Sequence, residues 1–322
     1  MSNPSASREQ LTVAFGRPGT ASSPVGQLIR QMEPDWLLTD TSSAPLAVLA
    51  STADVVCPVH EPVDQAMLEG TSVRFVQLLG VGTDGIDLQG LRALGIPVAN
   101  IPSRESGNAD AVAELAIAFT ITLVRRVDAS RSDAREGRLT PSFAPSLMGR
   151  RILLVGLGDV GSALASRLAA FRVHVTAIRS DPTKGSPAGV DMVFGPDALI
   201  DAMGTTDVVI LCAPPSDEPV LGRTALRAMK PGGYVVNVGR GSLIDEPALL
   251  DALEEGIIAG AALDVMDEEP PRRGHPLVAH PSVIVTPHVA GAALDVGIAS
   301  ARLFVENIRR LATPDGPHWV RN

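Results

Sequence analysis

The sequence has few cysteines and aromatic residues and no long uncharged apolar run. Its two cysteines, Cys57 and Cys212, cannot form a disulfide framework and lack metal-ligand spacing, so we predict no metal site and a cytoplasmic location. Without about 18 consecutive uncharged apolar residues there is no ordinary transmembrane helix, and residues 1–10 lack the apolar stretch of a signal peptide. Aromatic residues at 3% and a net charge of −9 disfavour nucleic-acid binding.

The chain does contain ample core-forming residues, since 45% of its 322 residues are hydrophobic, and its length suits about two domains. In the first third, short apolar runs alternate with helix-like segments. The predicted strands there are 11–15, 47–49, 55–57 and 75–79. Helices are expected around Ile29 and over 67–68 and 88–94. This alternation is typical of an α/β fold with a parallel sheet.

A second alternation follows a strongly apolar helix predicted over 108–126, which we expect to be buried at a domain or subunit contact. A loop rich in Pro, Ser and Gly spans 141–149. The strands expected after it are 152–155, 173–178, 208–211, 234–238, 260–265 and 283–286. A last helix over 292–311 has no strand to follow and could pack on the first unit. The sequence therefore predicts two α/β units, about 11–100 and 101–287.

A glycine-rich turn follows the predicted strand 151–155 and opens a helix over 162–171. Gly156 permits the tight turn, Gly158 lets the backbone approach a pyrophosphate, and Gly161 allows close packing of helix and strand. The helix N-terminus would face the anion. The turn predicts a dinucleotide site, and the alternative is a purely structural turn.

The end of strand 173–178 bears on the choice of cofactor. An acidic residue is expected there to bind the ribose hydroxyls, but the strand ends in Arg179 and Ser180. Arg179 could pair with a 2′-phosphate, with Ser180 and Lys184 adding a hydroxyl and a charge. We therefore predict NADP, with NAD as the alternative if Asp181 binds the ribose instead.

Three later polar residues each follow a predicted parallel strand, where open α/β sheets place their ligands. They are Arg240, Glu269 and His288. An Arg can bind a carboxylate with two hydrogen bonds, a His can supply a proton near neutral pH, and a neighbouring carboxylate favours the imidazolium. Taken singly, each could be a surface turn residue, a member of an acidic cluster or a loop histidine. Together they suit the reduction of a 2-oxo acid.

With these motifs in order, the sequence resembles the D-isomer-specific 2-hydroxyacid dehydrogenases over nearly its whole length. The segments that carry the resemblance are 77–87, 107–114, 156–161, 237–241, 264–270 and 286–291. The resemblance implies two Rossmann-like, doubly wound parallel-sheet domains. A dinucleotide-binding domain, 101–287, would be inserted in a substrate domain formed by 1–100 and 288–322. It also implies paired cofactor domains, so we predict a homodimer through the apolar helix at 108–126, with burial between the domains as the alternative.

The resemblance further implies an NAD(P)-dependent enzyme that moves a hydride between nicotinamide and a small D-2-hydroxy acid. Arg240 would bind the substrate carboxylate and the C2 oxygen, His288 would be the acid/base, and Glu269 would hydrogen-bond the imidazole. The backbone at Val81 and Gly82 would help to seat the carboxylate. The further residues expected to contact the cofactor are Asp159, Val160, Ala213, Pro214, Val238, Asp264 and His288. Of these, Asp264 would face the nicotinamide carboxamide.

The substrate stays open within the family. Glyoxylate or hydroxypyruvate suits the NADP-type strand end, whereas a phosphorylated acid, as in phosphoglycerate dehydrogenases, could be met by Arg104. Many of those enzymes carry C-terminal regulatory domains, which we expect to be absent here. A rival class is a dinucleotide-sensing binding protein like the corepressors of this superfamily.

Overall fold

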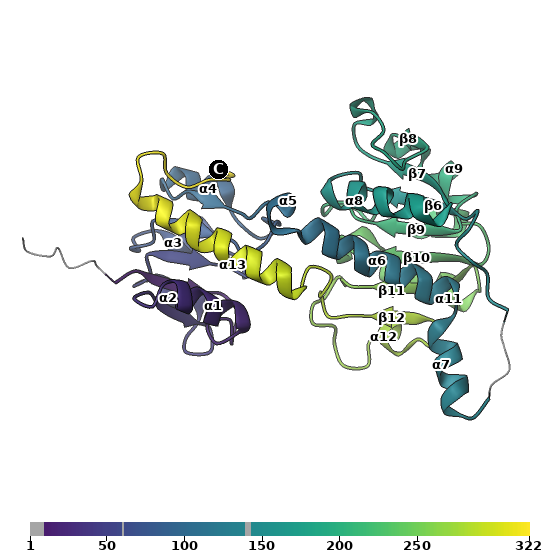
Figure 1. Ribbon diagram of the computed structural model, residues 1–322, viewed down its shortest axis with the longest axis horizontal. Coiled ribbons are helices and arrows are strands. Elements are labelled where there is room, and N and C mark those ends of the chain that lie inside the picture. Colours follow the sequence, from purple (N-terminus) through teal and green to yellow (C-terminus); the bar gives the residue numbers. More distant parts are fainter. Residues whose placement is uncertain (1–9, 60, 139–142) are drawn as a thin grey trace, which may run out of the picture. The chain divides into compact units, whose positions relative to one another are not determined.

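The computed structural model describes residues 10–59, 61–138 and 143–322. The chain forms two compact units, which are treated separately below (Figure 1). Unit 1 comprises Met1–Gly107 with Leu294–Asn322, and unit 2 comprises Asn108–Ala293. These divisions lie a few residues beyond the predicted ones at 100/101 and 287/288. None of the described helices is long and apolar enough to cross a membrane.

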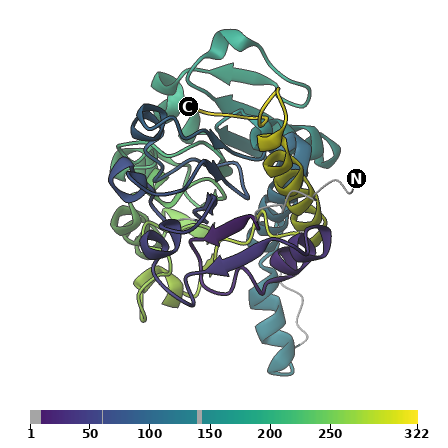
Figure 2. The same cartoon turned by 90° about the vertical axis from the view of Figure 1, so that its left-hand side faces the viewer.

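Unit 1 is built on a five-stranded parallel sheet with the strand order β2-β1-β3-β4-β5. Its strands are β1 (Thr12–Phe15), β2 (Leu37–Asp40), β3 (Val55–Cys57), β4 (Phe75–Gln77) and β5 (Val98–Ala99). Its helices are α1 (Pro24–Met32), α2 (Leu46–Ala50), α3 (Gln65–Leu68), α4 (Leu88–Ala93), α5 (Ser103–Ser106) and α13 (Leu294–Arg309). Although α13 is the last α-helix in the chain order, it packs beside α1 (Figure 2). The Phe304 ring stacks on that of Phe15, with the ring centroids 6.0 Å apart.

One predicted strand of unit 1 is wrong, because residues 47–49 lie in helix α2. Leu46 and Ala50 are buried four residues apart, whereas Val48 between them is 58% exposed, which is the spacing of a helix face rather than of a strand. A short apolar run cannot distinguish the two by itself. The strand that pairs with β1 at this edge is instead β2, and its pairing was not predicted.

Unit 2 holds a seven-stranded parallel sheet with the strand order β12-β11-β10-β9-β6-β7-β8. Its strands are β6 (Arg151–Val155), β7 (His174–Ile178), β8 (Met192–Phe194), β9 (Val208–Leu211), β10 (Gly233–Asn237), β11 (Ile258–Leu263) and β12 (Val283–Val285). Its α-helices are α6 (Asn108–Val124), α7 (Val127–Arg135), α8 (Asp159–Leu168), α9 (Leu199–Met203), α10 (Arg223–Ala228), α11 (Glu246–Glu254) and α12 (Pro276–Ala279). The predicted fold class, two doubly wound parallel sheets, is confirmed.

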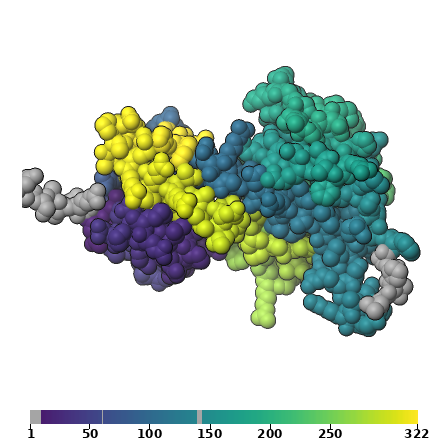
Figure 3. All heavy atoms as spheres, in the orientation of Figure 1, coloured from purple at the N-terminus to yellow at the C-terminus, as the bar shows by residue number. Residues whose placement is uncertain are grey.

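The order of the unit 2 strands reverses between β6 and β9, so the loops that follow these strands diverge to opposite sides of the sheet. Such a switch point is where open α/β sheets bind ligands. Contacts within unit 2 account for the apolar composition of helix α6, because it packs on α8, β10 and β11. By contrast, α7 has no buried residue and projects from unit 2 (Figures 1 and 3).

Candidate active site

The glycine-rich turn joins β6 to α8 at the switch point. Gly156 has a φ of +102°, and a Cβ there would lie 2.7 Å from the backbone nitrogen of Ala213, so only glycine fits. A Cβ at Gly161 would lie 2.4 Å from the carbonyl oxygen of Gly156. At Gly158, the N-cap residue of α8, a Cβ would meet nothing within 4 Å, and glycine has no side chain that could cap the helix. The turn thus leaves space in front of the α8 N-terminus, where backbone N–H groups can hold a phosphate.

Other predicted cofactor contacts surround this turn. Asp159 and Val160 begin α8, and Ala213 and Pro214 follow β9, the strand on the other side of the switch point. Val238 follows β10 and is buried. The structure therefore places these five residues beside the carboxyl ends of neighbouring strands, where a dinucleotide that lies on the turn would extend.

Arg179 and Ser180 directly follow β7, as the sequence predicts. The Arg179 N–H donates to the carbonyl of Phe194 at 3.0 Å, so β8 fixes the backbone at the strand end. Arg179 is half-buried and Ser180 is exposed. Asp181 accepts hydrogen bonds from the hydroxyl and the N–H of Thr183, at 2.5 and 3.1 Å, and these bonds lower the pKa of Asp181. Oδ1 of its carboxylate is therefore engaged in its own turn.

The turn after β10 carries Arg240 and is held by a buried asparagine. The Asn237 side chain accepts from the N–H of Gly239 at 3.0 Å and donates to the carbonyl of Arg240 at 2.8 Å. The guanidinium of Arg240 donates to the carbonyl of Gly239 at 2.8 Å. At Gly241 a Cβ would lie 2.0 Å from the carbonyl of Met266, so the turn lies directly against the loop that follows β11.

Asp264, at the end of β11, organises the segment after β12. It is 1% exposed, and its carboxylate accepts hydrogen bonds from the Thr286 hydroxyl at 2.5 Å and from the N–H groups of Val289 and Ala290, each at 2.8 Å. Its carbonyl accepts from the N–H of His288 at 2.8 Å. His288 has a φ of +54°, a left-handed conformation that non-glycine residues seldom adopt, and these bonds hold it there.

His288 and Glu269 form a direct pair. The imidazole Nδ1 lies 2.8 Å from Oε2 of Glu269, and Oε1 of Glu269 accepts from the N–H of Met266 at 3.0 Å. The hydrogen bond with Glu269 is the main cause of a raised pKa of His288, and it outweighs burial, which lowers that pKa. Arg240 is close enough to lower it as well. Arg240, Glu269 and His288 therefore lie together at the carboxyl ends of β10, β11 and β12.

Val81 and Gly82 lie in unit 1, on the loop after β4. Two backbone carbonyls of this loop are bound by the segment that follows β5: the Ile101 N–H donates to Gly80 at 3.0 Å, and the Asn100 side-chain amide donates to Val81 at 2.5 Å. The Val81 side chain remains 36% exposed. The loop is thus fixed from one side by the sheet edge of its own unit.

Sequence reasoning missed three residues that hold these segments. Two of them are Asn237 and Asn100. The third is Asp264, for which we predicted a contact with nicotinamide but not its hydrogen bonds to Thr286, Val289 and Ala290. Each is buried, and each follows or ends a buried strand. A buried polar residue needs partners, so an Asn or Asp at such a position was the available signal.

Comparison with known proteins identifies the family. The profile of the "D-isomer specific 2-hydroxyacid dehydrogenase, NAD binding domain" matches residues 117–290, more than half of the chain. The chain belongs to the D-isomer specific 2-hydroxyacid dehydrogenase family. The family consists of NAD(P)-dependent oxidoreductases, and the residues that match the profile of its NAD-binding domain all lie in unit 2.

Several relatives show how the family match extends. The chain is 32% identical to a glyoxylate reductase of Thermofilum pendens over 79% of this chain and 76% of that protein. It is 31% identical to a D-3-phosphoglycerate dehydrogenase of Archaeoglobus fulgidus over 80% of this chain, but it spans only 49% of that protein. A crystal structure of an NADPH-dependent glyoxylate/hydroxypyruvate reductase from Sinorhizobium meliloti, with NADP and malonate, is similar at a TM-score of 0.81. It is 27% identical, and the match covers 97% of each chain.

Proposed function

We propose that this dehydrogenase reduces a small 2-oxo acid of the glyoxylate or hydroxypyruvate type with NADPH, with unit 1 as the substrate domain. The observation that carries the proposal is the His288–Glu269 pair at 2.8 Å, next to Arg240 and on the same sheet edge as the glycine-rich turn. Support for the substrate class comes from the glyoxylate reductases of Thermofilum pendens, Aeropyrum pernix and Korarchaeum cryptofilum, of which the chain covers 72–78%.

The proposed chemistry divides between Arg240 and His288. When bound, the reduced nicotinamide supplies a hydride to the C2 carbonyl carbon of the substrate. The Arg240 guanidinium binds the substrate carboxylate and polarises the C2 oxygen. Because Nδ1 of His288 faces Glu269, Nε2 is the nitrogen that gives a proton to the C2 oxygen, which becomes the hydroxyl. Glu269 holds the ring and favours the imidazolium before the transfer.

The preference for NADPH rests on the end of β7. An arginine only donates hydrogen bonds, so Arg179 suits a 2′-phosphate better than ribose hydroxyls. In the rival ribose ligand, Asp181, Oδ1 already accepts two hydrogen bonds from Thr183. The similar Sinorhizobium meliloti reductase was crystallised with NADP, which supports the same choice.

A steady-state assay tests the reaction. The purified chain is given glyoxylate, hydroxypyruvate and bulkier 2-oxo acids with NADPH and with NADH. We expect turnover of the small acids, and a His288→Ala loss in kcat on the order of 10²–10⁴ with unchanged NADPH binding. His174→Ala, in a histidine that is 70% exposed, is the control and should act as the unmodified enzyme. NADPH binding without turnover of any acid would favour the dinucleotide-sensing alternative.

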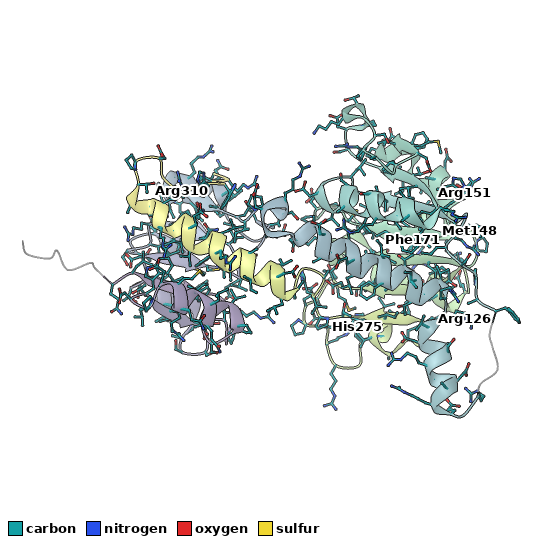
Figure 4. The ribbon with its side chains drawn as sticks, in the orientation of Figure 1. Arg126, Met148, Arg151, Phe171, His275 and Arg310 are labelled. Carbon is teal, nitrogen blue, oxygen red and sulfur yellow. The ribbon has the colours of Figure 1, made fainter. Side chains whose placement is uncertain are left out.

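We also infer that two copies pair through the α7 side of unit 2. The segment after α7 exposes apolar side chains, since Phe143 is 100% exposed and Met148 is 63% exposed. Met148 lies at the outer edge of this unit in Figure 4. Val127, at the start of α7, is 36% exposed. Exposed apolar side chains favour burial against a partner, here a second copy. A cytoplasmic location stays a prediction that rests on the cysteine content.

A further inference from the structure

The last residues of the chain form an extra edge on the sheet of unit 1. Val320 bridges Ala99 of β5 in antiparallel fashion, and the Arg321 N–H donates to the carbonyl of Val98 at 2.8 Å. The Asn322 side chain accepts from the N–H of Val98 and donates to the carbonyl of Ile96, both at 2.8 Å. The segment 318–322 is therefore fixed to β5 by its backbone and by its final side chain.

Two residues of the α13 end place this segment. The buried Asn307 donates to the carbonyl of His318 at 3.0 Å and accepts from its N–H at 2.5 Å. Arg310, labelled in Figure 4, donates to the carbonyl of Gly316 at 2.8 Å. These contacts do not involve the Arg321 side chain, so they remain when that side chain is changed.

The Arg321 side chain reaches the loop after β4 through one intermediate. Its Nε donates to Oδ1 of Asn100 at 2.7 Å, and Nδ2 of Asn100 donates to the carbonyl of Val81 at 2.5 Å. Asn100 is 2% exposed. Because a guanidinium can only donate, Arg321 requires the amide oxygen on its own side and so directs the amide nitrogen at Val81.

The direction of the Val81 carbonyl decides where the next N–H points. The peptide bond between Val81 and Gly82 is trans, so its carbonyl and the Gly82 N–H lie in one plane and point in opposite directions. The same holds one residue earlier, where Ile101 binds the carbonyl of Gly80. The N–H groups of Val81 and Gly82 are therefore turned away from the β5 side. Neither has a protein acceptor among the described residues.

We propose that Arg321 is a positioning residue for substrate binding, which acts through Asn100 to aim the N–H groups of Val81 and Gly82 at the substrate carboxylate. This rests on the proposed function, in which that loop seats the carboxylate. Arg321 touches neither substrate nor cofactor. Its loss should weaken binding in the ground state and the transition state alike, which raises KM and leaves kcat nearly unchanged.

The test compares Arg321→Met, which keeps an apolar stem, with Arg321→Lys, which keeps a donor. We expect Arg321→Met to raise KM for glyoxylate about 3- to 10-fold, the range of one lost hydrogen bond, with kcat and KM for NADPH nearly unchanged. Arg321→Lys should recover part of the loss. Arg309→Met is the matched control, because Arg309 lies in the same unit but pairs with Glu33, and its kinetics should match the unmodified enzyme.

A second measurement separates the two proposals. Hydrogen exchange of the Ile101 amide, which is bonded to Gly80, reports on the loop whether or not the enzyme turns over; it should quicken in Arg321→Met and not in Arg309→Met. Unchanged exchange together with unchanged KM overturns the positioning role alone. If the unmodified chain turns over no 2-oxo acid, the proposed function fails, and the carboxylate role given to this loop fails with it, even where exchange quickens.

Discussion

At the scale of single residues, the chemistry of His288 depends on a carboxylate that holds only one side of its ring. Glu269 binds Nδ1 and raises the pKa of His288, so the imidazolium persists to higher pH than that of an unpaired histidine. In the direction of reduction the proposed acid must carry a proton. The rate should therefore be full below the pKa of His288 and fall as the pH rises through it.

Substitution of Glu269 tests this sign. Glu269→Gln removes the charged partner, which lowers the pKa of His288, so the alkaline fall in kcat should move to lower pH. The loss of kcat should accordingly be larger at about pH 8 than at about pH 6. The measurement is a pH profile of kcat with saturating NADPH. Glu268→Gln, in the exposed neighbouring glutamate, is the control. An unshifted alkaline limb in Glu269→Gln would show that another group limits the rate.

Arg179 is the residue on which the cofactor preference should depend. Arg179→Asp removes the donors proposed for the 2′-phosphate and adds a carboxylate that repels it. We expect the unmodified enzyme to favour NADPH about 10- to 100-fold in kcat/KM, and the variant to favour NADH. Arg172→Asp makes the same charge change at an exposed residue two positions before β7 and should leave the order of cofactor preference intact. If the unmodified enzyme prefers NADH, the assignment of Arg179 is wrong.

How far the site could be predicted depended on the kind of residue. Arg240, Glu269 and His288 were chosen because their chemistry suits the reaction, and the structure brings them together. Asn237 and Asn100 act through hydrogen bonds to backbone carbonyls. The partner of Asn237 is Arg240, in the same turn, and that of Asn100 is Val81, which is distant in sequence. No spacing in the sequence reveals these partners. Their burial was the missing information.

At the scale of elements, the strands of unit 2 were predicted well because they are buried and continuous. In β6 and β9 nearly every residue is buried, so each reads as an apolar run. Three edge strands differ: β2 and β8 have exposed positions, and β5 has only two residues, so these three gave no clear pattern. The error at α2 has the same origin, since five residues are too few to show a helical period.

The β6–α8 turn offers a test that separates packing from binding. Gly161→Ala would place a Cβ 2.4 Å from the Gly156 carbonyl and should lower the free energy of unfolding by about 1–3 kcal/mol. Gly158→Ala meets no protein atom and has a negative φ, so its stability should be unchanged. It should nevertheless weaken NADPH binding at least about 10-fold, because the methyl group occupies the space where the pyrophosphate would approach.

Thermal unfolding without cofactor and fluorescence titration with NADPH measure the two effects on the same proteins. Each variant is the control for the other, since both add one methyl group to the same turn. Equal loss of stability in the two variants would contradict the packing argument. Unchanged NADPH affinity in Gly158→Ala would mean that the pyrophosphate does not lie against this turn.

At the scale of the whole molecule, the question is what covers the exposed apolar side chains after α7. Helix α7 has no buried residue, although a nine-residue helix is marginal in water unless it packs on something. The residues that follow it expose Phe143 and Met148. A second copy that uses the same surface would bury both features at once, because a two-fold interface is self-complementary.

Light scattering after size exclusion at about 10 µM should therefore find a dimer, and the double variant Phe143→Ser with Met148→Ser should raise the dimer Kd at least about 10-fold. The control is Met192→Ser, which removes a 53% exposed methionine from β8, away from this surface. Because Phe143 and Met148 touch no proposed catalytic residue, kcat of the separated copies should stay close to that of the dimer. If the double variant is still a dimer, the dimer must use another surface. If the unmodified chain is a monomer, α7 must be stabilised by ion pairs within the helix, such as that of Arg131 with Asp128.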